Sequence, residues 1–170
     1  AVLTGETLIG DEPFAVILAD DLCDCEGDGV ISQLIKVYEK YQCSVVAIEE
    51  VPLSQTRKYG IISGTPIENS NNTSLVEDMV EKPEENDSPS NMAVIGRYIL
   101  TPDIFKILSE IPPNKDGEIQ ITDALKIQAI KGKVIAYKFK GKRFDCGSIN
   151  GFLEATNYFA HKFKVEVSNS

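Results

Sequence analysis

Two short apolar runs separated by a helical pattern limit this chain to a small set of folds. Residues 14–18 (Phe-Ala-Val-Ile-Leu) are apolar without interruption, which is typical of a strand buried on both faces of a parallel sheet. Residues 30–41 carry apolar side chains at spacings of three and four, which predicts an amphipathic helix, and residues 44–49 repeat the strand pattern. Strand, helix and strand in that order predict a parallel crossover unit of a layered α/β fold.

The remainder of the chain continues this mixture of strands and helices. Its patterns predict strands at residues 59–63, 75–81, 91–100 and 134–139, a turn at 144–147, and helices from Thr101, over 121–131 and from Ser148 to Phe163. The first ten residues predict the end of a helix that stops at Gly10. Because 170 residues suffice for one hydrophobic core and are too few for two, residues 1–170 are predicted to form a single domain.

Charge and cysteine content argue against several classes of partner. Acidic residues outnumber basic ones by 26 to 17, and the net charge of −9 repels the phosphates of nucleic acids and anionic lipids. No apolar run approaches the roughly 20 residues that span a bilayer, so no membrane partner is expected. The four cysteines and the single histidine form neither a zinc motif nor a disulfide framework. Cys23 and Cys25, the one close pair, are interpreted as reduced structural residues of a cytoplasmic protein.

Carboxylates stand at three places where predicted strands end. Asp20 follows the first strand, Glu81 and Lys82 lie where a strand meets a loop, and Asp145 lies in the predicted turn. Ligands of open α/β sheets gather beyond the carboxyl ends of the strands, which makes Asp20 a candidate for a metal or phosphate site. Glu81 and Lys82 are suited to bind sugar hydroxyls and a phosphate. From the pattern alone, a solvated strand end or an ordinary turn explains each position at least as well.

Seven segments together resemble a known family. They are 14–20 (FAVILAD), 59–60 (YG), 80–83 (VEKP), 90–93 (SNMA), 96–100 (GRYIL), 117–124 (GEIQITDA) and 145–147 (DCG). Their order and spacing are similar to those of bacterial UTP–glucose-1-phosphate uridylyltransferases. Single motifs are shared with other sugar-nucleotide pyrophosphorylases, whereas the combination is similar to the glucose uridylyltransferase branch. The resemblance implies a Rossmann-like nucleotide-diphospho-sugar transferase fold, a layered α/β/α structure with a mixed sheet.

The resemblance also implies a role for each of five residues. Asp20 and Asp145 correspond to the carboxylates that bind a catalytic Mg²⁺, and both are hard oxygen donors. Gly60 corresponds to the glycine whose backbone lies against the sugar, and Glu81 to the acid that binds the glucose hydroxyls. Lys82 corresponds to the base that holds the phosphate of the sugar, and it is expected to act in catalysis together with Asp20.

The reaction implied by the resemblance is the synthesis of UDP-glucose from UTP and glucose 1-phosphate, with pyrophosphate as the second product. A phosphate that is already ionised needs no general base, so catalysis is expected to come from positioning and charge neutralisation. Asp21 stands beside the matched position and is assigned only a supporting role. The family resemblance also implies a homo-oligomer.

One part of the family pattern has no counterpart in these residues. The glycine-rich loop that binds the triphosphate and the segment that binds uracil would both precede Ala1. We therefore expect a C-terminal, sugar-phosphate-binding part that lacks the N-terminal part, is inactive or very weak alone, and exposes a sheet edge. Two alternatives stay open: a thymidylyl- or adenylyltransferase of the same superfamily, and a non-catalytic module for sugar-nucleotide binding or oligomerisation.

Overall fold

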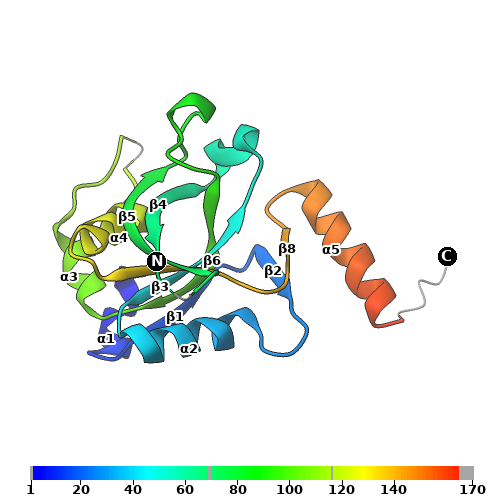
Figure 1. The fold of residues 1–170 in the computed structure, drawn as a ribbon, viewed down its shortest axis with the longest axis horizontal. Helices are drawn as coiled ribbons and strands as arrows, with labels where there is room; N and C mark the ends of the chain where they lie inside the picture. The colour runs from blue at the N-terminus through cyan, green and yellow to red at the C-terminus, as the bar shows by residue number, and fades with distance from the viewer. Residues whose placement is uncertain (1, 69, 116, 165–170) are drawn as a thin grey trace.

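The structure, a computed structural model, describes residues 2–68, 70–115 and 117–164. Its centre is a six-stranded mixed sheet with the strand order β1-β6-β3-β7-β5-β4 (Figure 1). These strands comprise β1 (Phe14–Ile17), β3 (Ser44–Glu50), β4 (Gly60–Pro66), β5 (Thr73–Glu81), β6 (Met92–Leu100) and β7 (Val134–Lys138). The pair β3–β7 is parallel and the other pairs are antiparallel, so the mixed sheet implied by the resemblance is confirmed.

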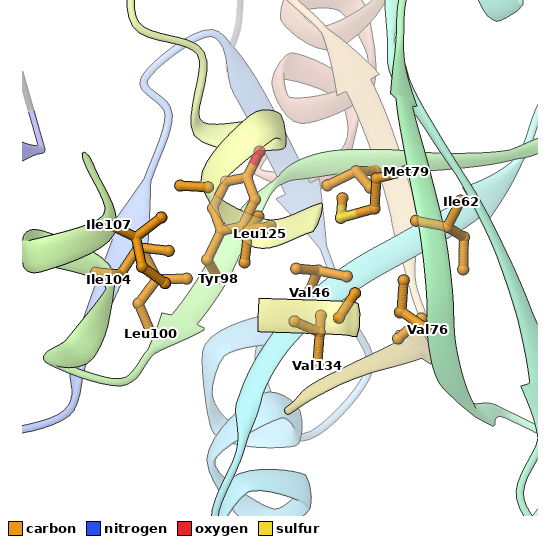
Figure 2. Close-up of a cluster of buried hydrophobic side chains, with 14 of the residues drawn as sticks. Val46, Ile62, Val76, Met79, Tyr98, Leu100, Ile104, Ile107, Leu125 and Val134 are labelled. Carbon is orange, nitrogen blue, oxygen red and sulfur yellow. The ribbon is translucent and has the colours of Figure 1, made fainter. Parts of the chain in front are cut away.

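Helices cover both faces of this sheet. Helix α2 (Val30–Tyr41) packs on one face, and α3 (Asp103–Glu110) and α4 (Ile121–Ile130) pack on the other. Alternate side chains of β3 point to opposite faces of the sheet. Val45 and Ala47 pack in the cluster under α2. Val46 and Ile48 pack in the cluster under α3 and α4, which Figure 2 shows around Val46. The result is the layered α/β/α arrangement that the resemblance implies.

The first strand differs from its sequence-based prediction. Strands β1 and β3 run parallel to each other, as expected of a crossover, but β6 lies between them and is antiparallel to both. Strand β1 therefore forms an edge of the sheet, and it is not buried on both faces: Ile17 is 57% exposed. Only Phe14 and Val16 pack inward, where the ring of Phe14 stacks on Phe105 at a centroid distance of 4.9 Å.

A second, two-stranded sheet was missed by the sequence patterns. Strands β2 (Asp21–Asp24) and β8 (Lys142–Asp145) pair antiparallel, with Asp21 opposite Asp145. The prediction of a turn over 144–147 is thus wrong for Phe144 and Asp145, which end a strand. Each strand has four residues and its partner lies far away in the sequence, so no local periodicity indicates it.

The remaining elements are short turns and helices. A 3₁₀ turn (Leu3–Gly5) and α1 (Glu6–Ile9) stop at Gly10, as expected. Two further 3₁₀ turns, in the middle of the chain, cover Leu53–Lys58 and Glu85–Asp87. Helix α5 (Ile149–Lys162) projects from the body beside β8 (Figure 1). Its predicted cap is confirmed, since Ser148 Oγ accepts a hydrogen bond from the Gly151 amide. Among the described residues, no helix combines the length and hydrophobicity needed to cross a membrane.

Candidate functional site

A cavity of about 260 Å³ opens where the β1–β2 turn, the starts of β4 and α4, and the ends of β5 and β8 come together. Four of the five residues assigned by resemblance line it: Asp20, Gly60, Glu81 and Asp145. Lys82 follows Glu81 at the rim. A larger cavity, of about 370 Å³, lies between α2 and β7 and contains none of these residues. The structure thus gathers at one place side chains that are far apart in the sequence.

The carboxylates of Asp20 and Asp145 share one small space beside Gly147. A methyl group placed on Gly147 would stand 3.2 Å from Asp20 Oδ2 and 3.2 Å from Asp145 Oδ1, so the absence of a side chain leaves this space open. The Cys146 amide donates to the carbonyl of Asp20 at 2.8 Å and ties the two segments together. The arrangement suits a hard divalent cation bound by carboxylate oxygens.

Two carboxylates alone do not complete the coordination of such a cation. Within residues 2–68, 70–115 and 117–164, no cluster of three or more His, Cys, Asp or Glu side chains is arranged to hold a metal ion. Mg²⁺ usually keeps several water molecules and binds through one or two carboxylates together with substrate phosphates. The pair formed by Asp20 and Asp145 therefore fits a cation that binds together with a phosphate-bearing ligand.

Asp21 has a different environment from Asp20. Its side chain is buried, with Oδ2 accepting a hydrogen bond from the Gly96 amide at 2.7 Å and Oδ1 accepting from Nε of Arg143. Arg143 also donates to Glu49 Oε1 at 2.6 Å. Burial alone would lower the pKa of Arg143, but the hydrogen bond with Tyr59 and the charge of Asp21 outweigh it and raise that pKa. Asp21 therefore forms a buried ion pair with Arg143 in the wall of the cavity.

At the other side of the cavity, Glu81 is oriented by Thr122. The Thr122 hydroxyl, in the first turn of α4, donates to Glu81 Oε2 at 2.6 Å. Gly60 lies opposite Glu81 in the β4–β5 pair, and a methyl group there would stand 3.1 Å from Thr122 Oγ1 and 3.3 Å from Glu81 Oε2. Any larger side chain at position 60 would fill the space in front of this carboxylate.

Lys82 is placed at the rim by an unusual backbone conformation. Its φ of 46° lies in the left-handed region, which costs a residue with a side chain about 1 kcal/mol or more. The Lys82 amide donates to the carbonyl of Tyr59 at 3.0 Å, which helps to hold this conformation. The ammonium group is exposed and lies 3.7 Å from Glu81 Oε1, so it can meet an anion that enters the cavity.

Sequence reasoning assigned no role to Tyr59, Thr122 or Arg143, although Tyr59 and Thr122 stand within the recognised motifs. The Tyr59 hydroxyl donates to Asp145 Oδ2 at 3.0 Å, and the guanidinium of Arg143 lies 4.9 Å from the centre of the Tyr59 ring. Burial raises the pKa of Tyr59, so the phenol stays protonated at neutral pH. These contacts join segments that are remote in the sequence, which is why local patterns give no sign of them.

The fold and this site define a nucleotidyl transferase. The sequence pattern of the family described as "Nucleotidyl transferase" matches residues 1–162, and the chain belongs to this family. Within it, the chain is 60% identical over 167 residues to a UTP–glucose-1-phosphate uridylyltransferase of Pseudomonas aeruginosa. That match covers 97% of this chain and 59% of the relative, so the chain spans less than two thirds of the relative's length.

Two solved structures are similar to this fold. A UDP-glucose pyrophosphorylase without ligand superposes with a TM-score of 0.90 at 59% identity, covering 95% of this chain and 59% of the other. A UDP-glucose pyrophosphorylase in complex with UDP-glucose gives a TM-score of 0.89 at 58% identity, covering 95% and 61%. Nucleotidyl transferases generally use a divalent metal ion, which agrees with the shared space between Asp20 and Asp145.

Proposed function

We propose that this chain carries the sugar-phosphate side and the metal-binding carboxylates of a UTP–glucose-1-phosphate uridylyltransferase, which makes UDP-glucose and pyrophosphate. The observation that carries the proposal is the meeting of Asp20, Gly60, Glu81 and Asp145 around one cavity. The 60% identity to a uridylyltransferase supports the choice of nucleotide and sugar. The thymidylyl- and adenylyltransferase alternatives are separated from it by the choice of nucleotide in the assay below.

In the proposed reaction, a phosphate oxygen of glucose 1-phosphate attacks the α-phosphorus of UTP, and the bond to pyrophosphate breaks. Glu81 accepts hydrogen bonds from the glucose hydroxyls, and Gly60 lets the sugar approach the sheet. Lys82 offsets the negative charge of the sugar phosphate. Asp20 and Asp145 hold Mg²⁺, which neutralises phosphate charge when bound. None of these residues has to move a proton, because the nucleophile is already ionised.

Three wider features belong to the same proposal. Residues 1–170 form one domain, which is supported by the two larger hydrophobic clusters, one on each face of the six-stranded sheet. The protein acts in the cytoplasm, where its four cysteines, all free in the structure, stay reduced. It assembles as a homo-oligomer, which agrees with apolar side chains exposed on α5, among them Ile149, Phe152 and Leu153.

The proposal is tested by calorimetric titration of UDP-glucose into the chain with Mg²⁺, comparing the unsubstituted chain with Glu81→Gln. Loss of a charge-assisted hydrogen bond is expected to weaken binding about tenfold or more. Because the segment that binds uracil would precede Ala1, UDP-glucose, TDP-glucose and ADP-glucose should bind with similar affinity, through the sugar and its phosphate. Pyrophosphate release from UTP, dTTP or ATP with glucose 1-phosphate is measured beside Asp20→Ala on a protein in which the family's N-terminal segment precedes residue 1, and there it tests the nucleotide and the metal carboxylate together. Failure of the unsubstituted chain to bind any of the three sugar nucleotides would refute the proposal.

A further inference from the structure

Tyr59 touches both ends of the site described above. Its hydroxyl donates to Asp145 Oδ2 at 3.0 Å, on the side where the metal-binding carboxylates face each other. Its backbone carbonyl accepts the amide of Lys82 at 3.0 Å, on the side where the sugar phosphate is expected. A single residue between the 3₁₀ turn and β4 thus connects the two charged ends of the cavity.

We propose that Tyr59 is a positioning residue that orients the Asp145 carboxylate for metal binding and holds the backbone of Lys82 in its left-handed conformation. The inference rests on the proposed function, because it gives Asp145 and Lys82 the roles assigned there. Tyr59 itself touches neither metal nor substrate in this account. It acts through the two residues that it holds.

The direction of the Tyr59 hydroxyl is set by Arg143. Nη1 of Arg143 donates to the Tyr59 oxygen at 3.3 Å, and a guanidinium has no acceptor to offer in return. The hydroxyl has one proton, so that proton is left for Asp145. Arg143 is in turn held by Asp21 and Glu49, and its side chain is only 6% exposed. The tyrosine is therefore supported from behind by a buried ion pair.

This arrangement leaves the two oxygens of Asp145 with different tasks. Oδ2 accepts the hydrogen bond of Tyr59, while Oδ1 accepts one from the Gly147 amide at 3.2 Å and borders the space shared with Asp20. Without the hydroxyl, Oδ2 loses its donor and the carboxylate is held only by the hydrogen bond from the Gly147 amide to Oδ1. The orientation of the carboxylate is then less firmly fixed, and a cation between Asp20 and Asp145 binds more weakly.

The test is the substitution Tyr59→Phe, which removes the hydroxyl and keeps the ring beside Arg143. Mn²⁺ serves as the probe, with its binding to the chain measured by electron paramagnetic resonance at saturating UDP-glucose. The dissociation constant of Mn²⁺ is expected to rise about tenfold, the usual consequence of losing a hydrogen bond to a charged group. The affinity for UDP-glucose measured without metal is expected to change less than about twofold, because the contacts of Glu81 and the Tyr59 carbonyl remain.

Tyr158→Phe is the matched control. The Tyr158 hydroxyl also donates to an aspartate, Asp24, at 2.6 Å, but on α5 and away from the cavity. Its loss should leave the Mn²⁺ dissociation constant unchanged. Equal weakening of Mn²⁺ binding by both substitutions would mean a general loss of structure and would overturn the inference.

Two further outcomes separate this inference from the proposed function. If Asp145→Asn weakens Mn²⁺ binding and Tyr59→Phe does not, the positioning role is overturned and the proposed function stands. If the unsubstituted chain binds neither Mn²⁺ nor UDP-glucose, both fail together. A selective effect of Tyr59→Phe on the metal, with sugar-nucleotide affinity retained, supports the positioning role, since a merely structural tyrosine would affect both.

Discussion

At the scale of single residues, the orientation of Glu81 depends on one hydroxyl group. Thr122 donates to Oε2 of Glu81 at 2.6 Å, while Oε1 lies 3.7 Å from Nζ of Lys82. The carboxylate is therefore held from one side and open to the cavity on the other. Thr122 is itself buried in the first turn of α4, so the start of that helix determines how the acid is oriented in the cavity.

Replacing Thr122 by valine should therefore weaken sugar-nucleotide binding while keeping the shape of the side chain. We expect the dissociation constant of UDP-glucose to rise about three- to tenfold, as for other lost hydrogen bonds to charged groups. Calorimetric titration measures the change. Thr65→Val is the control. Thr65 of β4 also donates to a glutamate of β5, Glu77 at 2.5 Å, but both residues lie outside the cavity. An effect of equal size in both variants would contradict the role given to Thr122.

At the scale of elements, α5 is held to the small sheet by an aspartate at the end of β2. Tyr158 donates to Asp24 at 2.6 Å, Lys162 donates to the same carboxylate at 2.5 Å, and the Phe144 ring of β8 lies 4.9 Å from the Tyr158 ring. Three apolar side chains of α5, Ile149, Phe152 and Leu153, are exposed, while Phe159 packs on Phe144 at a centroid distance of 5.7 Å. The polar contacts of Asp24 thus add to a small aromatic contact in attaching the helix.

This attachment should weaken in acid. The hydrogen bond from Lys162 and then that from Tyr158 lower the pKa of Asp24 below its usual value. A lowered folded-state pKa means that the stabilisation is complete above the unfolded pKa of about 3.9 and is lost as the pH falls through the folded value. Between pH 5 and pH 2, the amide resonance of Tyr158 should shift in the unsubstituted chain and stay constant in Asp24→Asn. The same titration curve in both proteins would show that Asp24 does not hold the helix.

Elements with a strong local period could be predicted from the sequence. Helix α2 begins where it was predicted, because its apolar face recurs every three to four residues. Strands β2 and β8 were not predictable, since each is short and is defined by a distant partner. The edge position of β1 was missed for a similar reason: an apolar run does not show which of its faces will be covered.

Some residues of the site could be predicted from the sequence and others could not. Asp20, Gly60, Glu81, Lys82 and Asp145 were found through motifs, and the structure brings four of them around one cavity with Lys82 at its rim. Their roles remain predictions. The supporting contacts made by Tyr59 and Arg143 could not be found from the sequence, because a hydrogen bond between residues on different strands leaves no local pattern.

At the scale of the whole molecule, buried charges join the small sheet to the large one. Asp21 belongs to β2 and Arg143 to β8, while their partners Gly96 and Glu49 belong to β6 and β3. Arg97 of β6 donates to the carbonyl of Leu18 in the β1–β2 turn and to the carbonyl of Asp21 at the start of β2. The turn that carries Asp20 is consequently fixed to the central sheet, so the geometry of the site and the stability of the fold depend on the same contacts.

Breaking this junction should destabilise the chain more than breaking an exposed pair. Asp21→Asn leaves the buried guanidinium of Arg143 with less compensation, and removing one partner of such a pair costs about 3 kcal/mol. Urea unfolding should show a lower midpoint with an unchanged slope. Asp28→Asn is the matched control: Asp28 pairs with Lys36 on the surface, where both side chains are more than half exposed, and its midpoint should barely move. Equal midpoints for the two variants would show that the small sheet is held by its apolar contacts, chiefly those of Phe144, rather than by the buried charges.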